Sequence, residues 1–203
     1  MGKWDELADD ARLERTVSAL KANGMDALVV DSGEQAKGKV LEIIPEGAEV
    51  MTMTSVTLDA TGIADEINNS GRFDSVRKRL ASMDRGKQWR EMQKLGAAQE
   101  YAIGSVHAVT EDGKVIIASA TGSQLPAYAY GSGKVVWVVG AQKIVKDMDE
   151  GMRRIEEYVL PLEDARARKA YGMGSGINKV LTVGKEFSPG RIKIILVREK
   201  LGF

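Results

Sequence analysis

The sequence predicts an α/β fold in which a mostly parallel, open sheet is flanked by helices. Residues 115–118 and 135–139 are continuous apolar runs rich in β-branched side chains, which is typical of strands covered on both faces. Short apolar runs also alternate with segments of helical periodicity along the chain, as in strands joined by crossover helices. Because Glu111-Asp112-Gly113-Lys114 is a hairpin turn signal, one antiparallel hairpin is expected near residues 103–118.

The amino-terminal third predicts helices with clear start and stop signals. Apolar residues recur at helical spacing over residues 4–22, and we expect this helical segment to pack on the rest of the domain. Ser32, followed three residues later by Gln35, forms a capping box for a second helix. Ser55 or Thr57 caps a third. Strands are expected between these helices, at residues 26–30 and 49–53.

In the remainder of the chain, the sequence predicts helices first and mainly strands after them. Two charged helices are expected around residues 76–83 and 89–95, and a later one from residue 148 that stops at Pro161. The β-branched segments predict the strands, at residues 103–109, 115–118, 135–139, 180–183 and 192–197. Residues 172–176 are rich in glycine and predict a loop.

Composition excludes several classes of function. The chain of 203 residues carries 29 basic and 29 acidic side chains, so nucleic-acid binding is not expected. The absence of cysteine excludes disulfides, iron–sulfur ligation and thiolate zinc sites within this chain, and with His107 as the one histidine we predict no metal site. Since no apolar run is long enough to span a membrane, we expect a single domain over residues 1–203 in a soluble, cytoplasmic protein.

The segments that follow the expected strands are rich in Gly, Ser and Thr. They are residues 31–33, 54–57, 119–123 and 140–143. Ligands of open parallel sheets bind outside the carboxyl ends of the strands, and helix starts at this edge favour anions. Ordinary helix capping uses the same residue types, so each segment alone has this simpler explanation.

Candidate site residues come from these segments and from the hairpin turn. The candidate ligand-binding residues are Ser55, Thr57, Gly113, Thr121, Gly122, Ser123, Gly140 and Lys143. Glu111 is the candidate catalytic carboxylate, on the condition that the turn folds over the strand ends, where burial would raise its pKa. His107 lies within an apolar strand pattern and is expected to be structural.

Two glycine-rich segments fail as nucleotide-binding motifs. Gly172, Gly174 and Gly176 lack the spacing of a dinucleotide fingerprint. The segment 131–134 ends like a phosphate-binding loop, but Tyr128 stands where that motif needs a glycine. Both segments are therefore expected to be turns or loops, and the sequence names no cofactor.

Four segments of the second half carry a resemblance to a known family. They are residues 106–113, 120–124, 131–135 and 139–145, supported by Ser55-Val56-Thr57-Leu58 and by residues 196–203. Together they resemble the LUD domain of the lactate-utilization family, over nearly the whole chain. The resemblance implies a fold similar to the sugar-phosphate isomerase and CoA-transferase group. It also implies a role in L-lactate oxidation beside iron–sulfur partners.

Departures from the family pattern weaken the inference about activity more than the inference about fold. Many single-domain members that resemble this chain have a cysteine-rich segment before the last strands, whereas residues 171–179 contain no cysteine. Ser123-Gln124 replaces a frequent Asn-Arg pair, and His107 replaces a frequent Asn. Any metal or cluster that relatives hold in the first segment is therefore not expected here.

Two functional hypotheses follow. The first is a protein that binds a small anion, either a hydroxy or keto acid or a phosphate-bearing ligand, through the loops 55–57 and 121–123 in lactate or organic-acid metabolism. Whether it is an enzyme stays open, with Glu111 as the carboxylate to test. The alternative is a non-catalytic or regulatory subunit of an iron–sulfur oxidoreductase complex. A homo-oligomeric domain without activity is a third reading.

Overall fold

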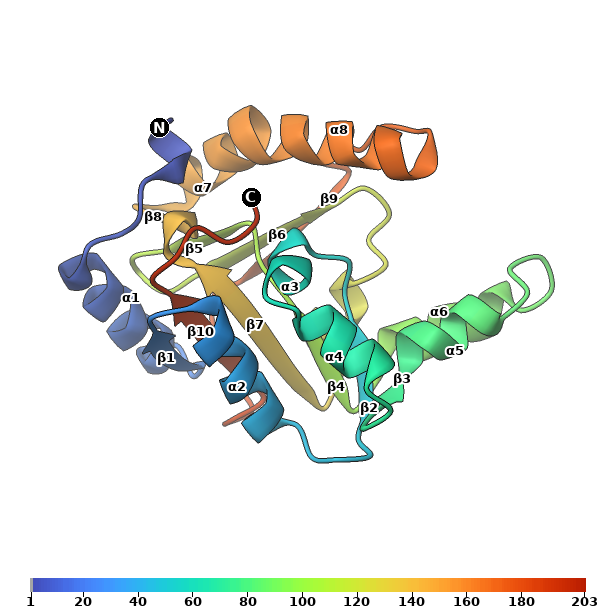
Figure 1. Ribbon diagram of the computed structural model, residues 1–203. Coiled ribbons are helices and arrows are strands. Elements are labelled where there is room, and N and C mark those ends of the chain that lie inside the picture. The colour runs from blue at the N-terminus through green and yellow to red at the C-terminus, as the bar shows by residue number, and fades with distance from the viewer. Residues whose placement is uncertain (1) are drawn as a thin grey trace.

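The main sheet of the protein contains six strands that all run parallel. The computed structural model describes residues 2–203 (Figure 1). The spatial order is β1-β10-β7-β4-β2-β3. The strands are β1 (Asp26–Val30), β2 (Glu49–Thr52), β3 (Asp74–Ser75), β4 (Tyr101–Gly104), β7 (Lys134–Gly140) and β10 (Ile192–Val197). The predicted α/β fold with a mostly parallel sheet is thus confirmed.

Helices cover both faces of this sheet. The amino-terminal elements are the 3-10 turn η1 (Lys3–Asp5), α1 (Asp10–Ala22), α2 (Gly33–Ile43), α3 (Val56–Ala60) and α4 (Ile63–Asn69). The predicted caps are confirmed, because the Ser32 hydroxyl accepts from the Gln35 N–H and the Ser55 hydroxyl accepts from the Leu58 N–H. The expected helix over residues 4–22 begins late, since regular α-helix starts only at Asp10.

Alternate residues of β7 enter two different hydrophobic cores. Val135, Trp137 and Val139 pack in a core with α1 and the small sheet. Val136 and Val138 pack on the other face with α2, α3 and α4. A strand covered on both faces has no need of alternating polar residues, which is why residues 135–139 are continuously apolar.

A second sheet of four strands lies at the carboxyl end of the first. Its order is β8 (Ile144–Val145), β5 (Ala108–Thr110), β6 (Val115–Ser119) and β9 (Lys179–Val183). β5 and β6 are antiparallel, so the predicted hairpin is confirmed. The arrowhead of β7 points towards β5 and β8 in Figure 1, which places the small sheet beyond that strand end.

One strand assignment in this region is corrected by the structure. Residues 103–109 do not form one strand, because the chain leaves the main sheet after Gly104 and enters the small sheet at Ala108. Residues 115–118 lie in β6, the second strand of the predicted hairpin, which is buried on both faces and pairs antiparallel with β5 and β9. One face of β6 packs on the main core and the other on α7 (Met148–Arg154), so burial alone did not identify the sheet type.

The prediction that Pro161 ends a helix is wrong. The helix continues from α7 through one π-helical turn, η4 (Ile155–Val159), into α8 (Leu160–Tyr171). In that turn the Leu160 N–H donates to the Ile155 carbonyl, five residues back. Pro161 follows immediately, near the first position of α8, where a missing N–H and a fixed φ are tolerated.

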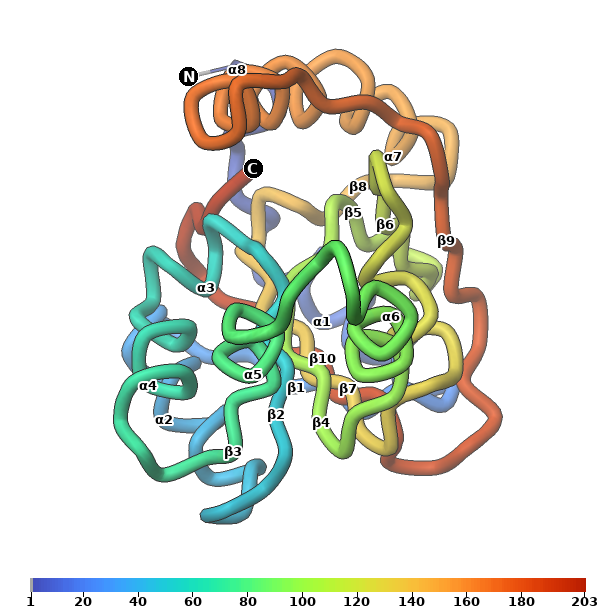
Figure 2. The backbone as a smooth tube through the Cα atoms, turned by 90° about the vertical axis from the view of Figure 1, so that its right-hand side faces the viewer, coloured from blue at the N-terminus to red at the C-terminus, as the bar shows by residue number. Residues whose placement is uncertain are grey.

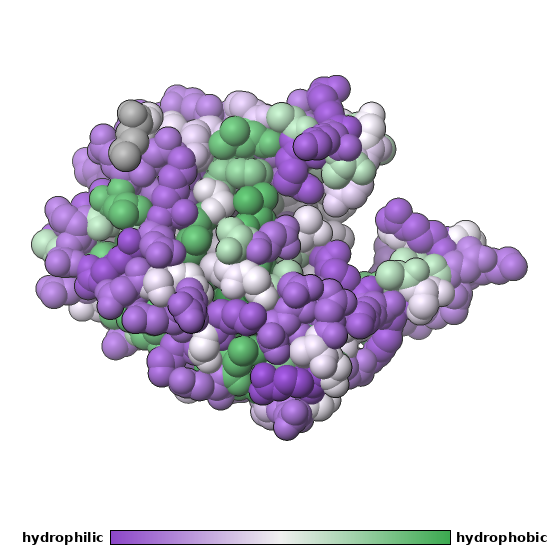
Figure 3. Space-filling view, viewed as in Figure 1, coloured by the Kyte–Doolittle hydropathy of each residue, from purple (hydrophilic) through white to green (hydrophobic). Residues whose placement is uncertain are grey.

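Helices α5 (Val76–Ser82) and α6 (Trp89–Ala97) form an arm that projects from the body of the molecule (Figure 1). Figure 3 shows a notch between this arm and the rest of the molecule. Figure 2 shows α8 across one end of the molecule, near the marked carboxyl end of the chain. Asp5 and Lys200 join the two ends through an ion pair of 2.6 Å. Among residues 2–203, none of the helices has the length and apolarity to cross a membrane.

Candidate functional site

Lys143 is a buried lysine at the carboxyl end of the main sheet. β7 ends at Gly140, and the 3-10 turn η3 (Ala141–Lys143) carries the lysine side chain into the protein, where it is 1% exposed. Its Nζ donates to the Thr57 hydroxyl and to the Ser105 hydroxyl, each at 3.1 Å. Thr57 opens α3 and Ser105 follows β4, so three segments distant in the sequence converge on one amine.

Arg154 is a second buried cation in the same region. It lies on α7, is 0% exposed, and its Nη1 donates to the His107 carbonyl at 2.6 Å. Its Nε and Nη2 have no hydrogen-bond partner among residues 2–203. Ser105 and His107 are two residues apart, which spans at most about 7 Å of chain. We call Lys143, Arg154, His107, Thr57 and Ser105 the buried cationic cluster.

Burial and mutual repulsion shift the pKa values in this cluster. Desolvation, helped by the charge of Arg154, lowers the pKa of Lys143 to about 7. Desolvation also lowers the pKa of Arg154 to about 10. For His107, desolvation and then the charges of Lys143 and Arg154 lower the pKa to about 3. The His107 ring is therefore neutral near pH 7, in agreement with its Nδ1 accepting from the Ala118 N–H at 3.1 Å.

The acidic group that influences Arg154 already has other partners. Asp5 acts on Arg154 through its charge. Its carboxylate pairs with Lys200 at 2.6 Å and accepts from the Tyr158 hydroxyl at 2.6 Å. Within residues 2–203, neither Lys143 nor Arg154 forms an ion pair with a carboxylate. The arrangement therefore offers a positive field and free N–H donors to an anion, and an amine that is only partly protonated.

Part of the predicted site is brought together here. Thr57 and Lys143 are in direct contact, and Gly140 lies at the strand end that leads to the lysine. The Thr57 hydroxyl also donates to the Leu201 carbonyl at 3.1 Å, which ties the site to the carboxyl-terminal segment. Ser55 caps α3 two residues before Thr57.

The candidates of the 121–123 loop lie after β6, a strand of the small sheet. The Thr121 hydroxyl bonds to the Ser123 hydroxyl at 3.1 Å. The Gly122 N–H donates to the Ser119 hydroxyl at 2.8 Å. These hydrogen bonds are internal to the loop, and none of them connects Thr121, Gly122 or Ser123 to Lys143.

Glu111 and Gly113 lie where the hairpin turn meets α1. The Glu111 carboxylate accepts from Arg12 Nε at 2.8 Å and from Arg15 Nη2 at 3.0 Å. Partial burial raises the pKa of Glu111, but the hydrogen bonds from Arg15 and Arg12 outweigh it, so the pKa is lowered. The raised pKa that burial over the strand ends would give this carboxylate is therefore not found at Glu111. These contacts fasten the small sheet to α1.

Sequence reasoning missed Ser105 and Arg154. Ser105 was hidden because residues 103–109 read as one strand, whereas a break after Gly104 places it at a strand end. Arg154 lies among the apolar positions of α7 and η4, directly before the buried Ile155. A charged residue at the edge of an apolar helix face was the available signal, because such a residue is buried only when something pairs with it.

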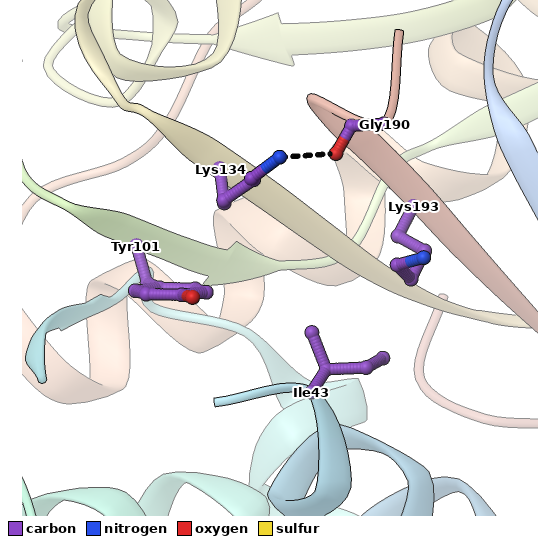
Figure 4. Close-up of a pocket in the computed structure, with 5 residues that line it drawn as sticks. All are labelled: Ile43, Tyr101, Lys134, Gly190 and Lys193. Carbon is purple, nitrogen blue, oxygen red and sulfur yellow. Dashed lines mark hydrogen bonds between the residues drawn. The ribbon is translucent and has the colours of Figure 1, made fainter. Parts of the chain in front are cut away.

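A pocket of about 380 Å³ lies at the opposite end of the sheet (Figure 4). Tyr101 and Lys134 begin β4 and β7 there, so this pocket is at the amino ends of the strands. Lys134 Nζ donates to the Gly190 carbonyl at 2.9 Å, and Lys193 pairs with Asp26 at 2.9 Å. Both lysines are thus already engaged, and the pocket lacks the unpaired cations found at the other end.

Comparisons with known proteins agree with this architecture. The family model described as LUD domain matches residues 13–197, which include Thr57, Lys143 and Arg154. A crystal structure of a DUF162 family protein from Deinococcus radiodurans is similar, with a TM-score of 0.58 and 13% identity. The alignment covers 95% of this chain and 99% of that one, and at this identity it shows the fold alone. The comparison with curated proteins gives no match.

Proposed function

The chain belongs to the LUD domain family, and from this premise we propose that it binds a small anionic metabolite in the buried cationic cluster. The family supports a lactate-utilization-like protein in general terms. Within that frame the ligand we propose is a hydroxy or keto acid, and the role is in lactate or organic-acid metabolism. A phosphate-bearing ligand shares the same anionic chemistry and is separated from the acids by the experiment below.

The observation that carries this proposal is that the buried guanidinium of Arg154 lacks hydrogen-bond partners for two of its nitrogens. A guanidinium that is 0% exposed leaves two of its three nitrogens without a partner, beside a second buried cation. Burying an unpaired charge costs several kcal/mol, and buried donors in native proteins are almost always satisfied. A bound carboxylate or phosphate would supply both the charge and the acceptors.

A short hydroxy or keto acid fits the distribution of donors. Its carboxylate would accept from the free nitrogens of Arg154, because guanidinium and carboxylate pair through parallel hydrogen bonds. Its neighbouring hydroxyl or carbonyl oxygen would lie towards the Lys143 amine and the Ser105 hydroxyl, which are 3.1 Å apart. Two polar groups on adjacent carbons would thus meet two kinds of donor.

We expect a true ligand to raise the thermal unfolding midpoint. Lactate, pyruvate, sugar phosphates and CoA form the test panel. A ligand at 100 times its dissociation constant adds about 2.7 kcal/mol, which is a shift of roughly 5–10 °C for a domain of this size. The shift should disappear in Lys143→Met and Arg154→Met, which keep much of the side-chain volume but remove the charge.

Matched controls lie beside both residues. Lys146 and Arg153 are exposed neighbours, so Lys146→Met and Arg153→Met should keep the full shift. Glu111→Gln tests the carboxylate and should bind like the wild type, because Glu111 is held by Arg12 and Arg15. A flat panel, or an equal shift in wild type and Arg154→Met, would remove this site from consideration.

The second candidate function, a subunit of an iron–sulfur oxidoreductase complex, is favoured by the charge of the arm. Residues 76–94 carry seven basic side chains and two acidic ones, in a chain whose net charge is zero. Helix α6 has no buried residue between Trp89 and Ala97, and Trp89 is 52% exposed with the Arg85 guanidinium over its ring. Figure 3 shows this arm standing clear of the body. An acidic surface on a partner subunit would complement it.

We expect salt-sensitive co-purification with iron-containing subunits from the native cell. Reversing three arm charges, with Arg85→Glu, Lys87→Glu and Arg90→Glu, should abolish it because the basic surface is lost. A control that reverses exposed lysines elsewhere, at Lys21, Lys39 and Lys169, should keep the partner. Recovery of the chain without any iron-containing protein, under low salt, would count against this candidate.

A further inference from the structure

The amine of Lys143 has a chemical capacity beyond binding an anion. We propose that Lys143 Nζ forms a reversible imine with the carbonyl carbon of a 2-oxo acid held in the buried cationic cluster. The proposal rests on the proposed function, because it names the substrate class of the same site. It also distinguishes keto acids from hydroxy acids, since only a carbonyl carbon can react in this way.

Formation of the imine releases one molecule of water and needs no other reactant. The Nζ lone pair attacks the carbonyl carbon and a C–N bond forms, while one amine proton passes to the carbonyl oxygen to give a carbinolamine. The hydroxyl of the carbinolamine then leaves as water with a second proton, and a C=N bond replaces the C–O bond. Nothing is oxidised or reduced, so the step needs no further reactant.

The surroundings of Lys143 suit an attacking amine. Activated lysines are desolvated or lie next to another cation, and Lys143 meets both conditions, being 1% exposed with Arg154 close enough to act on it. These conditions leave a substantial fraction of the amine unprotonated near pH 7. An ordinary exposed lysine is almost fully protonated at that pH.

Two hydroxyls hold the amine in place and provide a route for the protons. The Thr57 oxygen accepts from Nζ at 3.1 Å while its own proton goes to the Leu201 carbonyl, which fixes its orientation. The Ser105 hydroxyl also accepts from Nζ at 3.1 Å. Ser105 is only half-buried, so its proton can pass between the amine, the carbonyl oxygen and solvent.

Arg154 would hold the substrate at the correct end of the site. Its unpaired Nε and Nη2 are donors for the carboxylate, which directs the adjacent carbonyl carbon of a 2-oxo acid away from the guanidinium. The guanidinium of Arg154 does not compete with Lys143 as a nucleophile, because a guanidinium remains protonated near pH 7. Binding and reaction are thus assigned to two different cations.

A purely structural role is the competing explanation for Lys143. In that role the amine only joins α3 to the segment after β4 through Thr57 and Ser105. It would then neither react with a carbonyl compound nor differ from other lysines in labelling. Reductive trapping separates the two roles directly.

The test is borohydride trapping of the full chain with pyruvate near pH 7. Reduction of the imine would leave a 1-carboxyethyl group on the lysine, located by peptide mass spectrometry. We expect the Lys143 peptide to be labelled about tenfold or more above the Lys146 peptide, because the lowered pKa of Lys143 leaves part of its amine unprotonated near pH 7. Lys143→Arg should lose the label, since it keeps the positive charge but has no amine to react. Lys146→Arg should retain it.

Lactate and thermal unfolding complete the design. Lactate should compete with pyruvate and reduce labelling of Lys143, yet leave no adduct itself because it lacks a carbonyl. If pyruvate raises the unfolding midpoint but Lys143 stays unlabelled, the imine is wrong while anion binding stands. If labelling is spread evenly over exposed lysines, the imine is equally wrong. If neither pyruvate nor any other anion shifts the midpoint and no adduct forms, both proposals fall.

Discussion

Replacing Gly113 with alanine is expected to lower the free energy of unfolding by about 2–5 kcal/mol. Gly113 has φ of +80°, a conformation that costs an L-residue about 1–2 kcal/mol. A β-carbon there would also lie 2.6 Å from the Ala19 carbonyl carbon and 2.7 Å from the Leu20 nitrogen, both in the backbone of α1. Relief would require the helix to move, because no flexible side chain is in the way. Urea unfolding measures the loss.

Gly47→Ala is the matched control for this variant. Gly47 has φ of +79°, but a β-carbon there meets nothing within 4 Å, so only the backbone cost of about 1–2 kcal/mol applies. The difference between the two variants isolates the contact of the hairpin turn with α1. Asn23 reinforces that contact by donating to the Asp112 and Gly113 carbonyls at 3.0 Å. Equal losses in both variants would mean that the turn does not press on the helix.

Replacing Lys143 with methionine is expected to stabilise the protein most near neutral pH, and progressively less as the pH rises. The pKa of Lys143 is lowered from 10.5 to about 7 in the folded protein. Between these values the unfolded chain binds a proton that the folded protein does not, so wild-type stability rises with pH by at most about 1.4 kcal/mol per unit. Methionine has no proton to bind and lacks this dependence.

The measurement is the difference in free energy of unfolding between Lys143→Met and wild type, by urea titration from about pH 7 to pH 10. Taking the difference cancels the titration of all other groups, provided that they are unaffected by the substitution. Lys146→Met serves as the control, because that side chain is exposed and its replacement should change the free energy of unfolding only slightly. A constant difference for Lys143→Met would show that the amine titrates as an ordinary lysine.

Both variants also bear on the proposed site. Gly113→Ala acts on the turn that carries Glu111, at the contact with α1, and should leave ligand affinity unchanged in the folded fraction. Lys143→Met should remove ligand affinity while raising stability near pH 7. Loss of binding together with a gain in stability is the behaviour of a functional residue whose burial is costly to the fold.

The local features of this protein were determined by its sequence. Ser32 and Ser55 cap helices because a hydroxyl reaches a backbone N–H three residues away, and the hairpin turn at Glu111-Asp112-Gly113-Lys114 forms for equally local reasons. The unbroken apolar run over 135–139 required a strand covered on both faces. The resemblance to the LUD domain likewise followed from segments of sequence, and the family match confirms it.

The tertiary structure alone decided which cations are buried together. Lys143 meets Thr57 across 86 residues of chain, and Arg154 meets His107 across 47. Whether a lysine is solvated or desolvated depends on the segments that pack over it. The periodicity of apolar residues indicates which face of a helix or strand is buried, but not which segment covers that face. The same limit applies to Pro161, which a π-helical turn accommodates, and to the split of residues 103–109 between two sheets. Helix caps and tight turns depend on hydrogen bonds between residues a few positions apart, whereas burial is settled by contacts between distant residues.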